Sequence, residues 1–104
     1  MVSKELLSSI WNKQVDEVFY YNDNLIWFEI EGEEYQSNIY ELAYIAKQWV
    51  RDNFSLEIIS CAKITTINYC YDLSVTPFKT LIHEKNELEA VFKAAQFILD
   101  EYNK

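Results

Sequence analysis

Residues 38–50 read NIYELAYIAKQWV, and this stretch decides the fold. Asn38 followed three residues later by Glu41 has the pattern of a capping box, in which two side chains satisfy free backbone N–H groups at a helix start. Apolar residues then recur at helical spacing, namely Leu42, Ile45, Ala46, Trp49 and Val50. A single apolar stripe is typical of a helix that packs one face on a core. The sequence therefore predicts a helix over residues 38–53.

The C-terminal end repeats this pattern. Asn86 and Glu89 form a second capping pair. The apolar stripe that follows is Leu88, Val91, Phe92, Ala95, Ile98, Leu99 and Tyr102. This predicts a final helix over residues 87–102, with Phe92 buried in the middle of the stripe. A shorter helix is predicted after Ser3, because the next apolar residues share one side of a helix.

Two segments before the long helix predict a β-hairpin. Val15–Tyr21 and Leu25–Glu31 are rich in β-branched and aromatic residues, and the cluster Asn22-Asp23-Asn24 between them favours a turn. Pairing Tyr21 with Leu25 predicts a core face of Val18, Tyr20, Ile26, Phe28 and Ile30. The other face is then Val15, Glu17, Phe19, Trp27, Glu29 and Glu31. Its aromatic side chains need a cover, either the N-terminal helix or a partner protein.

A second hairpin is predicted from Leu56–Ala62 and Ile67–Leu73, with Cys61 opposite Cys70. Its core face is expected to hold Leu56, Ile58, Ile67, Tyr69, Tyr71 and Leu73. Pro77 cannot donate to a central ladder, so Phe78–His83 is predicted to be an edge strand.

These elements predict an α+β fold for residues 1–104 as a single domain. We expect one antiparallel sheet of four to five strands, with the two long helices on one face. The short N-terminal helix is expected to cover part of the other face. The element order is α-ββ-α-ββ(β)-α, a loose duplication of a helix followed by a hairpin.

The composition excludes several kinds of partner. Seventeen acidic residues against nine basic ones give a formal charge of −8, which repels the phosphates of nucleic acids and anionic membranes. The longest stretch without charge, Ile64–Tyr71, is eight residues, far below the ~18 of a membrane span. The start resembles no secretory signal, so we expect an intracellular protein, cytoplasmic in its host cell. Cys61 and Cys70 are then expected to be reduced thiols.

Candidate chemical sites are few. His83 beside Glu84 could act as a base or a ligand, but no nucleophile or metal-ligand pattern accompanies it, and a structural role is favoured. Gly32 is the sole glycine, which excludes glycine-rich phosphate-binding loops. The run of Glu29, Glu31, Glu33 and Glu34 could hold a cation, yet it lacks the pattern of a calcium loop. We therefore expect no catalytic residue, cofactor or metal, and an enzyme is the least favoured reading.

The distribution of charge is the most informative feature. Between Gln14 and Ala46 there are eight acidic residues and no lysine or arginine, and aromatic residues are interleaved with them. Tyrosine and tryptophan anchor many protein interfaces, and an acidic surround steers a basic partner. The predicted partner-binding residues are Phe19, Tyr21, Trp27, Glu29, Glu31, Glu33, Glu34 and Tyr40. The alternative is a surface that is acidic only for solubility.

Two segments of this chain carry a resemblance. Asn38-Ile39-Tyr40-Glu41-Leu42 with Trp49, and residues 86–94 (NELEAVFKA), resemble small accessory proteins of phages and prophages with an α/β sandwich. The resemblance implies a mobile-element protein, for which binding and inhibiting host machinery is a common role. With the acidic segment, it leads us to expect a non-enzymatic module that occupies a basic, nucleic-acid-binding surface of a host defence protein, as an anti-CRISPR-like inhibitor. The alternative is an oligomeric structural or housekeeping phage protein.

Overall fold

The computed structural model describes residues 2–20, 24–60, 64–69, 78–82 and 87–103. The described elements follow the order α-βββ-α-βββ-α, so a helix followed by three strands occurs twice before the last helix. The fold is α+β, as predicted. The strands form two separate antiparallel sheets, β1-β2-β3 and β4-β5-β6. The expectation of one sheet of four to five strands is therefore wrong.

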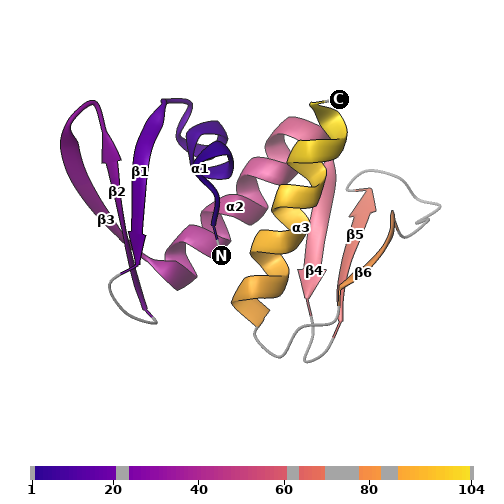
Figure 1. Ribbon diagram of the computed structural model, residues 1–104. Helices are drawn as coiled ribbons and strands as arrows, with labels where there is room; N and C mark the ends of the chain where they lie inside the picture. The colour runs from indigo at the N-terminus through magenta and orange to yellow at the C-terminus, as the bar shows by residue number, and fades with distance from the viewer. Residues whose placement is uncertain (1, 21–23, 61–63, 70–77, 83–86, 104) are drawn as a thin grey trace.

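The helices lie between the two sheets and form the middle layer (Figure 1). Helix α1 (Lys4–Trp11) packs on β1, and α2 (Ile39–Phe54) and α3 (Glu87–Tyr102) pack on each other and on β4. Only the start of α2 reaches the first sheet, through β3. Both predicted long helices are confirmed to within one residue, as is the short helix after Ser3.

The helix ends follow from local chemistry. Asn38 has an extended backbone, and its side-chain oxygen accepts hydrogen bonds from the backbone N–H groups of Tyr40 (2.9 Å) and Glu41 (3.4 Å). These bonds confirm the Asn38 half of the predicted capping box. Ser3 caps α1 in the same way, accepting from the Leu6 N–H at 3.0 Å, and its hydroxyl also donates to Gln96 on α3. One serine thus starts α1 and ties it to the last helix.

The first sheet consists of β1 (Val15–Tyr20), β2 (Leu25–Ile30) and β3 (Glu33–Asn38). The predicted β1–β2 register is confirmed from Tyr20 opposite Ile26 to Glu17 opposite Glu29. A bulge follows, because Val15 rather than Asp16 pairs with Ile30. The bulge turns Val15 to the core face, where it is buried. Its predicted place on the mixed face is therefore wrong.

Strand β3 is absent from the predicted topology. A two-residue turn, Glu31-Gly32, joins it to β2, and both residues have positive φ angles of 52° and 81°. This is the conformation of a tight hairpin turn, for which glycine is suited. The side chains of β3 are mostly exposed, so its sequence carries no apolar alternation that would mark it as a strand.

The second sheet consists of β4 (Leu56–Ser60), β5 (Thr65–Tyr69) and β6 (Phe78–Ile82). Leu56, Ile58 and Ile67 are buried on the predicted core face, and β6 is the predicted edge strand. The register differs from the prediction, since Leu56 pairs with Tyr69 and Ser60 with Thr65. The β-branched residues at 64–67 favour a strand, so β5 begins at Thr65, two residues before the predicted start. Cys61, Cys70 and His83 lie outside the described residues.

The core fills the space between the layers. Its largest fully buried side chains include Phe28 from β2, Leu42 from α2 and Phe92 from α3. Trp11 packs edge-to-face on Phe28, with ring centroids 5.3 Å apart. Helix α1 therefore lies on the core face of the first sheet. The expectation that it covers the opposite face is wrong.

A candidate protein-interaction surface

The outer face of the β1–β3 sheet is the face that points away from the helices (Figure 1). Strand alternation places Glu17 and Phe19 from β1, and Trp27 and Glu29 from β2, on it. Strand β3 adds Glu34 and Gln36, which pair with Glu29 and Trp27. We call the face defined by these six residues the outer face. In the described chain no helix packs on it.

The outer face has two rows of side chains that cross all three strands. One row is Phe19, Trp27 and Gln36, each directly opposite the next. Phe19 keeps 45% of its surface exposed and Trp27 is partly buried between its neighbours. The second row is Glu17, Glu29 and Glu34, also directly opposite one another. Neighbouring strands lie about 4.8 Å apart, so the three carboxylates are close enough to repel each other.

The tight turn adds another acidic group beside these rows. Glu31 is exposed in the turn, and its backbone N–H donates to the Asp16 carboxylate at 3.2 Å. This hydrogen bond links the bulge of β1 to the turn between β2 and β3. It restrains one end of the outer face, where the bulge and the turn meet.

Glu33 lies on the opposite face from the acidic row. It pairs with Ile30, and its carboxylate accepts a hydrogen bond from the Tyr35 hydroxyl at 3.1 Å. This bond and the charges of Glu33 and Glu31 raise the pKa of Tyr35 above its usual value. Tyr35 stacks on Phe28 with ring centroids 5.9 Å apart. Glu33 therefore belongs to the edge of the core face.

Tyr40 is also remote from the outer face. It projects from the first turn of α2, is 61% exposed, and lines a pocket between α2 and α3. Of the predicted residues, the structure brings together Phe19, Trp27, Glu29 and Glu34, with Glu31 beside them. It separates Glu33 and Tyr40 from this group, and Tyr21 lies outside the described residues.

Sequence reasoning did not assign Glu17 and Gln36 to the site. Strand alternation predicts the correct face for Glu17. The row of three carboxylates to which Glu17 belongs is complete only with Glu34 on β3. Gln36 and Glu34 could be placed only after residues 33–38 were recognised as a strand. The signal available was Gly32 after Glu31, a pair suited to a two-residue hairpin turn.

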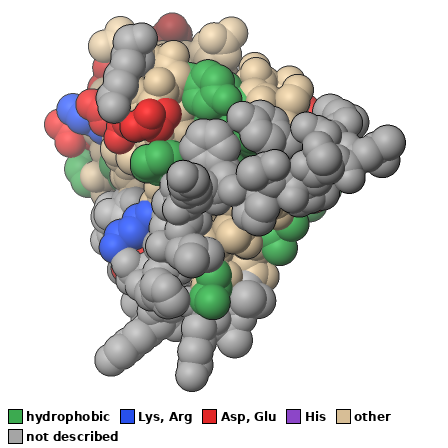
Figure 2. Space-filling model, turned by 90° about the vertical axis from the view of Figure 1, so that its right-hand side faces the viewer, with side chains coloured by type: hydrophobic (Ala, Val, Ile, Leu, Met, Phe, Trp, Pro, Cys, Tyr) green, Lys and Arg blue, Asp and Glu red, His purple; other side chains and the backbone are tan. Residues whose placement is uncertain are grey.

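The β4–β6 sheet forms the opposite side of the molecule. Figure 2 looks onto the β4–β6 side, where the described hydrophobic side chains are separated from one another. Ile59 and Ile64 are the exposed large apolar residues of β4 and of the segment before β5. Scattered apolar residues of this kind are normal on a protein surface.

Two kinds of site are not found in the described residues. No group of three histidine, cysteine, aspartate or glutamate side chains among them is arranged to hold a metal ion. None of the described helices is long and apolar enough to cross a bilayer. Comparison with family models, with curated proteins and with solved structures finds no match for this chain.

Proposed function

We propose that this chain is a non-enzymatic protein-binding module whose outer face binds a basic surface of another protein. The observation that carries the proposal is a row with an exposed Phe19 and a partly buried Trp27 beside a row of three carboxylates, on a sheet face that no described helix covers. Aromatic residues supply contact area at an interface, and concentrated charge raises the rate of encounter with a partner of opposite charge.

The acidic row also has a cost to the fold. Like charges directly opposite each other on a sheet are destabilising, and neutral side chains would avoid that penalty. No lysine or arginine within residues 14–46 offsets them in the sequence. A function that needs dense negative charge would explain why the sequence retains three carboxylates that destabilise the sheet.

The partner we propose is a host defence protein with a basic, nucleic-acid-binding surface. A protein that binds nucleic acid carries the lysine and arginine residues that an acidic row would attract. The chain would then act in the host cytoplasm as an anti-CRISPR-like inhibitor of a phage or related mobile element. The resemblance of residues 38–49 and 86–94 to small phage accessory proteins supports this setting.

The test uses two variants with the same net charge. The first, Glu17→Gln/Glu29→Gln/Glu34→Gln, removes the acidic row. The control, Asp52→Asn/Glu57→Gln/Glu101→Gln, removes three exposed charges from other elements. A partner is captured from a nuclease-treated host lysate, and its association rate is measured over a range of salt concentrations.

We expect the acidic-row variant to associate more slowly and with a weaker salt dependence, while the control keeps most of the rate. Phe19→Ala should mainly raise the dissociation rate, because it removes contact area. Equal association rates for the two triple variants would refute a role for the acidic row.

A second function is favoured by the exposure of Phe19 on a sheet with open edges. A second copy of the chain could cover this residue, as in an oligomeric structural or housekeeping protein. Sedimentation velocity at several concentrations distinguishes the two functions. Self-association that Phe19→Ala abolishes would favour the oligomer, and a monomer at all concentrations would favour the binding module.

A further inference from the structure

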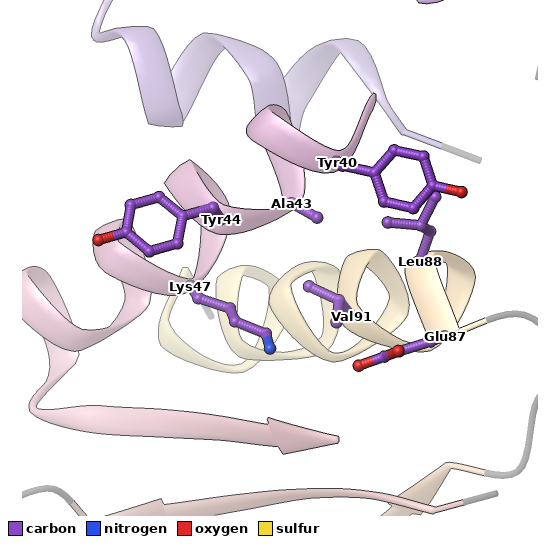
Figure 3. A pocket seen from close by; sticks show the side chains of 7 residues that line it. All are labelled: Tyr40, Ala43, Tyr44, Lys47, Glu87, Leu88 and Val91. Carbon is purple, nitrogen blue, oxygen red and sulfur yellow. The ribbon is translucent and has the colours of Figure 1, made fainter. Parts of the chain in front are cut away.

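A pocket of about 540 Å³ lies between α2 and α3, on different elements from the outer face. Its lining residues are Tyr40, Ala43, Tyr44, Lys47, Glu87, Leu88 and Val91 (Figure 3). Pockets that bind small molecules span roughly 300–1,000 Å³. This pocket therefore has room for a ligand of amino-acid size.

Two opposite charges face each other across the pocket. The Lys47 side chain extends from α2 toward the α3 side, and the Glu87 carboxylate points back from the first turn of α3 (Figure 3). The structure records no ion pair between these two described residues. The pocket thus presents a cation and an anion as two separate binding groups.

Glu87 is held in place by a neighbouring strand. The hydroxyl of Ser60, at the end of β4, donates to its Oε1 at 2.7 Å. The second carboxylate oxygen, Oε2, remains available to accept a hydrogen bond from a ligand. Lys47 is partly buried, and its side chain runs from α2 toward Val91 on α3.

The rest of the lining is apolar or aromatic. Ala43 and Val91 are buried, with Val91 between the two charged groups and Ala43 between the two tyrosines, and Leu88 is partly buried beside Tyr40. Tyr40 and Tyr44 stand at the rim, 61% and 63% exposed. Aromatic rims with an apolar floor suit a ligand that carries a hydrophobic group.

We propose that this pocket binds a small zwitterion with an apolar side group, such as an aromatic amino acid. The ligand carboxylate would contact Lys47, its ammonium group would contact Glu87, and its side group would lie on Ala43, Leu88 and Val91 between the two tyrosines. A simple anion would meet the repulsion of Glu87, and a simple cation that of Lys47. A zwitterion satisfies both groups at once.

The test is a titration of the ¹⁵N-labelled chain followed by NMR. The probes are L-phenylalanine, phenethylamine, which lacks the carboxylate, and N-acetylphenylalanine, which lacks the ammonium group. We expect saturable shifts of the amides of α2 and α3 near the pocket with L-phenylalanine. Each altered probe should bind about three- to fivefold more weakly, as one exposed ion pair contributes little more.

Two variants and one control complete the test. Lys47→Met keeps the aliphatic stem, and Glu87→Gln keeps an acceptor for Ser60, so both should fold and both should weaken L-phenylalanine binding by a similar factor. Lys13→Met removes an exposed lysine that does not line this pocket and should leave binding unchanged. Equal binding of the three probes, or the absence of saturable shifts at the pocket, would overturn the proposal.

Discussion

Glu29 on β2 lies directly opposite Glu34 on β3, and it faces Glu17 on its other side. Because like charges in such pairs destabilise a sheet, Glu29→Gln should raise the free energy of unfolding by about 0.2–1 kcal/mol. Urea denaturation at low salt measures this gain, and high salt should reduce it by screening. Glu57→Gln is the control, since Glu57 on β4 lies opposite the uncharged Asn68 on β5. An equal gain in both variants would contradict mutual repulsion within the row.

The turn between β2 and β3 is strained at Glu31. This residue has a φ of 52°, a conformation that asparagine adopts more readily than glutamate. We expect Glu31→Asn to stabilise the chain by roughly 0.5–1 kcal/mol, measured by thermal or chemical denaturation. Glu31→Gln removes the same charge and keeps the strain, so it should gain less. Gly32→Ala should lower the free energy of unfolding by about 1 kcal/mol, because alanine adopts a φ of 81° less readily than glycine. The added methyl group meets open space, so no steric clash adds to this cost.

Asn38 ends β3 and starts α2. Its side chain accepts two backbone N–H groups, so Asn38→Ala should lower the free energy of unfolding by ~1 kcal/mol. Asn38→Asp keeps the accepting oxygen and should retain most of the stability. Chemical denaturation measures the free energy of unfolding of the two variants. An equal decrease in both would mean that the accepting side-chain oxygen does not stabilise the helix start.

Phe92 is fully buried at the centre of α3. Phe92→Ala removes a large side chain from the packed core and should cost about 3–5 kcal/mol in free energy of unfolding. Glu101→Ala on the exposed side of the same helix should change it by less than about 0.5 kcal/mol. If denaturation finds the two variants equally stable, the helix does not pack as described.

The raised pKa of Tyr35 provides a test at the edge of the first sheet. Its largest cause is the hydrogen bond to Glu33, so Glu33→Gln should return the pKa toward the usual value of about 10. A raised pKa favours the protonated phenol in the folded state. The stabilisation is therefore present below about pH 10 and is lost as the pH rises through the folded-state pKa. Ultraviolet absorbance of tyrosinate measures the titration, and Glu34→Gln, on the other face, should leave it unchanged.

The helices were the most predictable part of this fold. Capping residues and apolar stripes mark them locally, and α2 and α3 begin and end within one residue of the predicted bounds. Strand β3 was missed because its burial is low on both faces, so its sequence lacks the alternation on which strand prediction depends. The division into two sheets could not be predicted, since hairpins specify local pairing and not which hairpins join.

The candidate site was predicted in part. Alternation along β1 and β2 correctly placed Phe19, Trp27 and Glu29 on one face. The one-residue bulge at Asp16 reversed the face of Val15, and no local signal marks it. Closeness in sequence groups Tyr40 with the acidic segment. The packing of α2 against α3 places it in the pocket instead, a contact between residues far apart in the chain.

The middle position of the helices has a consequence for how this protein can evolve. Since the core of the first sheet is built from alternate residues, the intervening positions 17, 19, 27, 29, 34 and 36 can change without altering what the core buries. Under the proposed binding function, substitutions at these positions would change the contacts with a partner more than the core. We therefore expect diversity among homologues to concentrate at these positions, so that one scaffold can acquire new targets while its interior stays the same.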